Sequence, residues 1–157
     1  MTTDVVKKVL ILAPPSLLPQ WQDELLSKFN LDFISQQGDK RFTNVFSHDL
    51  LIMSHASAVF PNYSEALKEI FWDLVVVDEA HSMKNSETYK HKLVKKLSKR
   101  HLLLLTATPI QNNLEELYNI VELLRPGYLG TWNQFKDKYA FSKDARSLNP
   151  IYRDQLQ

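Results

Sequence analysis

The sequence contains no cysteine, and this absence excludes several classes of protein. Its 157 residues include no thiol that could form a disulfide, bind a metal as a thiolate or act as a nucleophile. The longest early apolar run, Val9 to Ala13, is too short for a signal peptide or a membrane span, and it leads into Pro14-Pro15. We therefore expect an intracellular protein of the cytoplasm with no membrane partner.

Glycine and net charge are also scarce. The three glycines, Gly38, Gly127 and Gly130, cannot form a phosphate-binding loop of the G-x-x-x-x-G-K-[ST] type anywhere in the chain. The formal net charge is only +1, so the overall composition does not indicate a nucleic-acid or membrane partner. Any such partner has to be inferred from local features.

The apolar residues that are present follow two alternating patterns. Short runs rich in leucine and β-branched residues predict strands at 9–12, 31–34, 50–53, 74–77 and 102–105. Because these runs are continuous, they predict strands buried on both faces. Between them, apolar residues recur at helical spacing. The three helical groups are Trp21, Leu25 and Phe29; Tyr89, Leu93 and Leu97; and Leu114, Leu117, Tyr118 and Val121.

The order of these segments predicts an α/β fold with a parallel sheet flanked by helices. The third helix has Asn113 as its N-cap and ends at Pro126-Gly127, and a short helix is expected over 132–139. With 44% hydrophobic residues, the chain can form one sizeable core. We therefore expect a single globular unit.

The strand predicted at 74–77 leads directly into two carboxylates, Asp78 and Glu79. Ligands of open α/β sheets bind outside the carboxyl ends of the strands, so both side chains should face a crevice. Phosphoryl transfer needs one carboxylate that holds Mg²⁺ and a second group that orients or deprotonates water. Asp78 suits the first role and Glu79 the second. An acidic helix cap would give the same pair, but the strand context favours the Mg-ATP site.

The strand predicted at 102–105 ends in Thr106-Ala107-Thr108-Pro109. Hydroxyls at this edge can hydrogen-bond to the carboxylates or to phosphate. On its own, the segment would equally well be a strand that ends in a turn.

Together these two segments resemble the Swi/Snf family of helicase superfamily two. Asp-Glu-Ala-His at 78–81 is similar to the Walker B box, and Thr-Ala-Thr-Pro-Ile-Gln-Asn-Asn at 106–113 is similar to the family's third motif. The resemblance runs from Val9 to about Tyr139 and is strongest to the bacterial branch with RNA-polymerase-associated translocases. It implies a RecA-like lobe that uses ATP and Mg²⁺. The implied nucleotide-site residues are Asp78, Glu79, His81, Thr106 and Thr108, with Gln111 and Asn112 at the nucleic acid.

The amino-terminal half agrees with this resemblance. Residues 12–24 are similar to motif Ia, in which Ser16 is placed to cap a helix and to contact a DNA phosphate. Ser54 stands where the family carries motif Ib, a second backbone contact. We expect Trp21 to pack in the core and His55 to lie on the surface.

The sequence also departs from the family. Members carry a loop ending in Gly-Lys-Thr before motif Ia, and no such loop is present. The resemblance therefore implies a partial lobe over 1–130, without its first strand and phosphate loop, followed by the start of an extension over 131–157. The second lobe is missing too. We expect the chain alone to hydrolyse no ATP, and the intact parent to move along duplex DNA, with RNA polymerase or another protein complex as a further partner.

Two other functions stay open. The chain could be a non-catalytic module, derived from such a lobe, that binds nucleic acid or protein. It could also be a lobe of an RNA helicase, although Thr106 and 111–113 argue against this. A predicted lysine stripe on one helix, formed by Lys92, Lys95, Lys96 and Lys99, is either a solvated face or a DNA contact.

Overall fold

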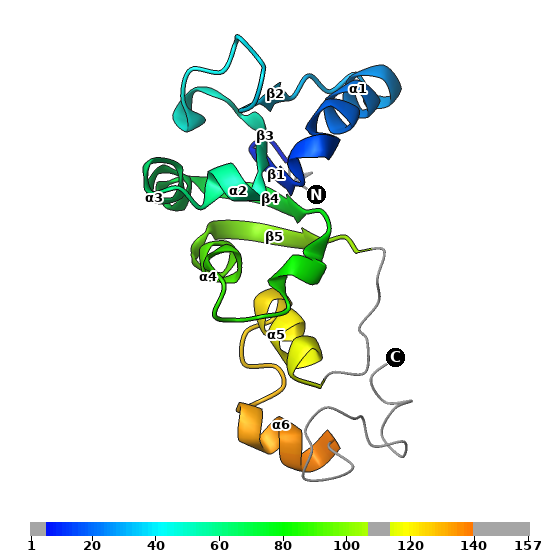
Figure 1. The fold of residues 1–157 in the computed structure, drawn as a ribbon, viewed down its shortest axis with the longest axis vertical. Helices are drawn as coiled ribbons and strands as arrows, with labels where there is room; N and C mark the ends of the chain where they lie inside the picture. The colour runs from blue at the N-terminus through cyan, green and yellow to red at the C-terminus, as the bar shows by residue number, and fades with distance from the viewer. Residues whose placement is uncertain (1–5, 107–113, 140–157) are drawn as a thin grey trace, which may run out of the picture.

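One parallel sheet organises the part of the chain that the computed structural model describes, residues 6–106 and 114–139. Its strand order is β2-β3-β1-β4-β5 (Figure 1). The strands are β1 Val9–Ala13, β2 Ile34–Ser35, β3 Leu50–Ser54, β4 Phe71–Val77 and β5 Ser98–Leu104. The helices are α1 Leu18–Phe29, α2 His55–Ala58, α3 Pro61–Glu69, α4 Tyr89–Lys96, α5 Leu114–Leu124 and α6 Trp132–Tyr139. The predicted α/β class and parallel sheet are confirmed.

The central strand β1 sets the register of the sheet. Ile11 lies opposite Ile52 of β3 and Val76 of β4. All five residues of β1 are buried, as its continuous apolar run predicted. At the other end of the sheet, β4 pairs with β5, and Val76 lies opposite Leu103.

Helices cover the two faces of this sheet unequally. Side chains of α2, α3, α4 and α5 join the larger apolar cluster on one face. On the other face, α1 places Leu18, Trp21 and Leu25 in a cluster with Ile11 and Val76. In the described part of the chain, α1 is the one helix on that face (Figure 1). The sheet is therefore thinly covered where β5 forms its edge.

The strands differ from the predictions at two places. Only the last residue of the predicted strand 31–34 belongs to β2, which is Ile34–Ser35. Strand β5 begins at Ser98, four residues before the predicted run, and Leu103 is 47% exposed. The prediction that this strand is buried on both faces is wrong, because helices pack against only one side of its leucines.

The predicted helices are present, but some of their apolar residues lie outside the core. Phe29 of α1 is 66% exposed and Tyr89 of α4 is 82% exposed. Leu97 is not inside a helix, since it has extended backbone angles and follows the last residue of α4. The helical period did not single out α3. None of the helices in the described residues is long and apolar enough to cross a membrane.

The last two helices form a smaller cluster of their own. Leu114 and Leu117 of α5 are buried with Phe135 of α6, beside the rings of Tyr118 and Trp132. The predicted helix end near Pro126-Gly127 and the predicted helix at 132–139 are both confirmed. The expected N-cap, Asn113, lies outside the described residues.

Candidate functional site

The two adjacent carboxylates lie where β4 ends. The Asp78 amide donates to the carbonyl oxygen of Leu12 at 2.8 Å, and the Ala80 amide donates to that of Leu105 at 2.8 Å. These bonds tie the turn at 78–80 to the end of β1 and to the residue that follows β5. The turn is therefore fixed at the carboxyl ends of three neighbouring strands, where α/β sheets bind ligands.

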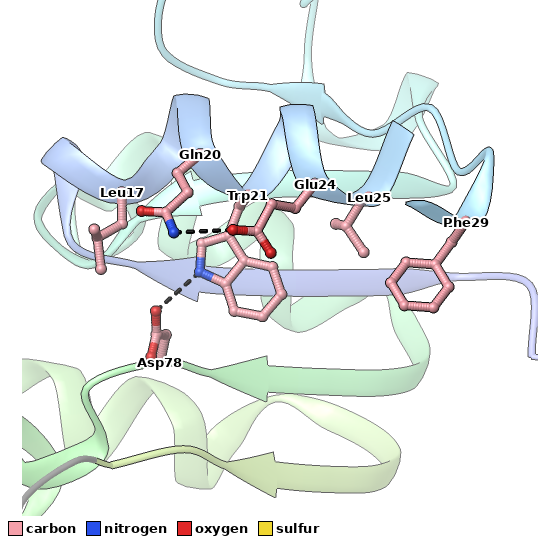
Figure 2. Close-up of a pocket in the computed structure, with 7 residues that line it drawn as sticks. All are labelled: Leu17, Gln20, Trp21, Glu24, Leu25, Phe29 and Asp78. Carbon is pink, nitrogen blue, oxygen red and sulfur yellow. Dashed lines mark hydrogen bonds between the residues drawn. The ribbon is translucent and has the colours of Figure 1, made fainter. Parts of the chain in front are cut away.

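Both oxygens of the Asp78 carboxylate accept a hydrogen bond. Oδ1 accepts the backbone N–H of Glu79 at 2.9 Å. Oδ2 accepts the indole N–H of Trp21 at 2.9 Å (Figure 2). Each carboxylate oxygen has a second lone pair, so both retain capacity to bind a cation.

Glu79 has an unusual backbone conformation. Its φ and ψ are both 50°, in the left-handed region that residues other than glycine rarely adopt. Its Oε2 lies 3.0 Å from Nδ1 of His81, and both side chains are partly exposed. Because a carboxylate only accepts hydrogen bonds, the His81 Nδ1 carries the proton in this contact. Such strain persists where the surroundings enforce it, as is common at functional sites.

His55 contacts the same turn from the opposite side. It is 5% exposed, and its Nε2 lies 2.8 Å from the main-chain oxygen of Asp78. That oxygen is an acceptor, so Nε2 is the donor. Burial lowers the pKa of the imidazole below its usual range. The prediction that His55 lies on the surface is wrong, because α2 begins at this residue and turns it inward.

An open groove lies beside the Asp78 carboxylate. Its walls come mainly from α1 and the residue before it, and include Leu17, Glu24, Leu25 and Phe29. The ring of Trp21 extends from α1 toward Asp78 (Figure 2). The groove lies on the thinly covered face of the sheet. Of the residues predicted at the nucleotide, Asp78 is the one that the groove includes among its described lining.

The donor set fits a magnesium ion that is shared with phosphates. In the described residues, no group of three or more His, Cys, Asp or Glu side chains could hold a metal ion by itself. Mg²⁺ usually binds to one or two carboxylates and takes its other ligands from water and phosphate. The carboxylate of Asp78 is therefore sufficient as the protein ligand of such an ion.

Three comparisons with known proteins bear on this site. Residues 1–153 match the family described as the SNF2-related domain. The chain belongs to the SNF2-related domain family. This finding agrees with the Swi/Snf resemblance of the sequence, although it does not distinguish the RNA-polymerase-associated branch.

The relatives of this SNF2-related domain are much longer proteins. It is 39% identical over 154 residues to a Bacillus subtilis protein named as the uncharacterized ATP-dependent helicase YqhH. The alignment covers 98% of this chain and 27% of that protein. It is 33% identical to the human TATA-binding protein-associated factor 172 over 88% of this chain and 8% of that protein. The chain thus spans about a quarter of the length of YqhH.

A solved structure with the same fold contains DNA. The Sulfolobus solfataricus SWI2/SNF2 ATPase core in complex with double-stranded DNA matches 86% of this chain, with 32% sequence identity and a TM-score of 0.74. The alignment covers 28% of that protein chain. A second structure, of the Sulfolobus solfataricus SWI2/SNF2 ATPase core domain, also matches 86% of this chain, with a TM-score of 0.68.

The two serines expected at DNA differ in their surroundings. Ser16 is exposed in a 3₁₀-helix at Pro15–Leu17, and α1 has Leu17 at its N-cap position with no side-chain cap. The prediction that Ser16 caps this helix is wrong. Ser54 is 2% exposed and caps α2, with its Oγ accepting from the Ser57 amide at 3.0 Å. Its hydroxyl therefore already has a structural role.

The third motif lies partly outside the described residues. Thr106 is described and exposed, just beyond the segment that pairs with the 78–80 turn. Thr108, Gln111 and Asn112, which the sequence placed at the nucleotide and the nucleic acid, lie outside the described residues. Their roles stay predictions.

The prediction that four lysines form one stripe on a single helix is wrong. Lys92, Lys95 and Lys96 are exposed on α4, but Lys99 belongs to β5. The Nζ of Lys99 donates to the carbonyl oxygens of Val94 at 2.8 Å and Leu97 at 3.2 Å. It is therefore committed to the end of α4 and is not part of a DNA-facing stripe.

Sequence reasoning missed the two residues that hold Asp78 from outside the turn. Trp21 was expected to be a core residue, and His55 a surface residue. Both contacts join positions far apart in the chain, 57 and 23 residues from Asp78. The helical spacing did predict that Trp21 packs against the core, and Trp21 lies in the cluster on the inner side of α1, but the spacing gives no sign of where its N–H points.

Proposed function

We propose that this SNF2-related domain works as part of the first ATPase lobe of a DNA translocase, with Asp78 and Glu79 at the nucleotide. The observation that supports this most directly is the rigid turn at 78–80, which presents both carboxylates beyond the end of β4. The family match and the DNA-bound relative agree with it. The relative YqhH is a longer protein, of which this chain spans 27%.

Within this proposal the two carboxylates have different tasks. Bound Mg-ATP would supply the phosphoryl group that water attacks, with its charge spread over metal and phosphate oxygens. Asp78 holds the cation through the free lone pairs of its carboxylate. Glu79 would accept the proton of the attacking water, and the N–H at His81 Nδ1, 3.0 Å from Oε2, orients its carboxylate.

The chain alone should not complete this reaction. Its sequence contains no G-x-x-x-x-G-K-[ST] loop to bind the β- and γ-phosphates, and positioning supplies most of the catalysis of phosphoryl transfer. We expect steady-state ATP hydrolysis at background level, with or without duplex DNA. DNA-stimulated hydrolysis that disappears in Glu79→Gln would contradict this expectation.

DNA binding provides a direct test of the proposed function. We expect weak binding to duplex DNA that is independent of sequence and falls steeply as salt is raised, because phosphate contacts release counterions. Fluorescence anisotropy with a labelled duplex measures this, and single-stranded RNA should compete poorly. Tight binding that persists at high salt, or preference for RNA, would contradict the proposal.

Two charge variants, one just before α1 and one near its end, test the predicted role of Ser16. Ser16→Glu places a negative charge at the proposed phosphate contact and should weaken duplex binding several-fold. Ser27→Glu adds the same charge near the other end of α1, where Ser27 is also exposed, and should bind as the wild type does. Equal weakening in both variants would indicate a general charge effect and contradict the Ser16 contact.

The remaining partners rest on the resemblance alone. Association with RNA polymerase and location in the cytoplasm stay predictions. The alternative of a non-catalytic binding module also predicts DNA binding. It differs in one respect, because a longer form of the protein would then hydrolyse no ATP that Glu79→Gln could abolish.

A further inference from the structure

The orientation of the Asp78 carboxylate depends on one side chain from outside its own turn. Oδ1 is held locally, by the amide of the next residue, Glu79. Oδ2 is held by the indole N–H of Trp21, 57 positions earlier in the sequence, at 2.9 Å. Rotation of an Asp carboxylate about its terminal bond is only weakly restricted, so these two bonds together define its plane.

Trp21 is itself held firmly. It lies in the first half of α1, and its ring packs in the same apolar cluster as Leu18 and Leu25, against the sheet. Its N–H emerges from this packing toward Asp78 (Figure 2). The donor is therefore positioned by a helix, and its direction does not depend on a mobile side chain.

The chemistry of indole suits the partner of a metal ligand. The indole N–H only donates, so it cannot compete with the carboxylate for a cation. It carries no charge, whereas Lys or Arg at the same place would neutralise the carboxylate and repel Mg²⁺. A hydrogen bond to an ionised carboxylate is also stronger than one between neutral groups. Each Asp78 oxygen keeps a lone pair for the metal.

We propose that Trp21 is a positioning residue for the metal-binding carboxylate of Asp78. This inference rests on the proposed function, in which Asp78 holds Mg²⁺. Trp21 would not touch the metal, and it acts by fixing Oδ2, and with it the plane of the Asp78 carboxylate, beside the groove that Asp78 helps to line.

The hydrogen bond can be tested first without any metal. In ¹H–¹⁵N spectra of the full chain, the three indole N–H signals are assigned by replacing Trp21, Trp72 and Trp132 singly with Phe. Asp78→Ala removes the acceptor, so the Trp21 indole signal should move upfield and exchange faster with solvent. The signals of Trp72 and Trp132 should stay in place. An unchanged Trp21 signal would overturn the proposal, and this measurement uses native Trp21.

The positioning role is tested with Mn²⁺, a paramagnetic substitute for Mg²⁺. Mn²⁺ bound at Asp78 broadens the amide signals of Glu79 and Ala80, and their loss with added metal gives an affinity. Trp21→Phe retains the apolar ring and loses the N–H, and affinity should fall about 10-fold, as is common for partners of metal ligands. Leu18→Ala disturbs the same apolar cluster, at a residue of α1 that does not line the groove beside Asp78, and should bind as the wild type does.

The outcomes separate this inference from the proposed function. Equal affinity of the wild type and Trp21→Phe would overturn the positioning role and leave the metal site intact. Equal loss in Trp21→Phe and Leu18→Ala would overturn it too, because packing alone would then explain the effect. Absence of broadening at Glu79 in the wild type would overturn the metal assignment together with the positioning role.

Discussion

At the scale of single residues, Asp78 is contacted by side chains from two other elements, Trp21 of α1 and His55 of α2. A buried strand that leads into Asp78 and Glu79 predicts two carboxylates at a crevice, because strand direction fixes where the chain emerges. The sequence could not show that Trp21 and His55 converge on Asp78. Those contacts depend on the packing of α1 and α2 on the sheet.

Asp73 provides a prediction at this scale. Its Oδ2 accepts the backbone N–H groups of Lys7 and Lys8, each at 2.9 Å, and so joins the entry of β1 to β4. These two bonds, that of Lys8 first, hold the pKa of Asp73 below its ordinary value of 3.8. We expect Asp73→Asn to lower the melting temperature at neutral pH.

The pH dependence of this difference follows from the sign of the shift. A carboxyl whose pKa is lower in the folded state stabilises the fold above about pH 4, and this stabilisation is lost as the pH falls through the folded-state pKa. The melting temperatures of wild type and Asp73→Asn should therefore converge below pH 4. Asp49→Asn removes an exposed partner of the Lys8 side chain and should change little at any pH. A constant gap across the pH range would contradict this account.

At the scale of elements, the apolar pattern located β1, β3 and the end of β4, but it misplaced β2 and the boundary between α4 and β5. Leu93 and Leu97 are four residues apart, which is also the spacing of a helix, and both are buried. The chain becomes extended at Leu97, so Lys99 enters the sheet. Periodicity cannot resolve such a boundary, because the residue after a helix can point into the same core.

The corrected boundary leads to a second prediction. The Lys99 ammonium, half-buried, satisfies carbonyl groups at the end of α4 that have no partner within the helix. Lys99→Met keeps the apolar stem and loses these bonds, so the free energy of unfolding should fall by about 1 kcal/mol. Lys95→Met, which removes an exposed lysine 3.8 Å from Glu122, should be near neutral. Chemical denaturation of both variants measures the difference, and equal effects would contradict the capping role.

At the scale of the whole molecule, the sheet was predictable and its unequal covering was not. The parallel arrangement follows from apolar runs separated by helical segments, although the run at 31–34 contributes only Ile34 to β2. How many helices cover each face depends on the crossovers, which the pattern does not specify. In the described residues, α1 alone covers the face on which Leu103 and Val76 lie, and Leu103 is consequently 47% exposed.

This arrangement leads to the last prediction, which concerns self-association. In the described part of the chain β5 pairs with β4 alone, so its other edge faces no described strand. Lys99 and Arg100 lie in its first half, and the run from Leu102 to Leu104 has no charge. Uncharged apolar edges promote pairing between molecules. We therefore expect the chain to associate through 102–104 as its concentration rises.

Light scattering across a concentration series measures this association. Leu103→Lys places a charge on the exposed apolar part of the edge and should keep the chain monomeric to higher concentration. Phe46→Lys is the matched control. Phe46 is 52% exposed and lies in the segment just before β3, a strand toward the other edge of the sheet from β5. It should associate as the wild type does. A wild type that stays monomeric throughout, with slowly exchanging amides at 102–105, would instead show that another part of the chain protects this edge.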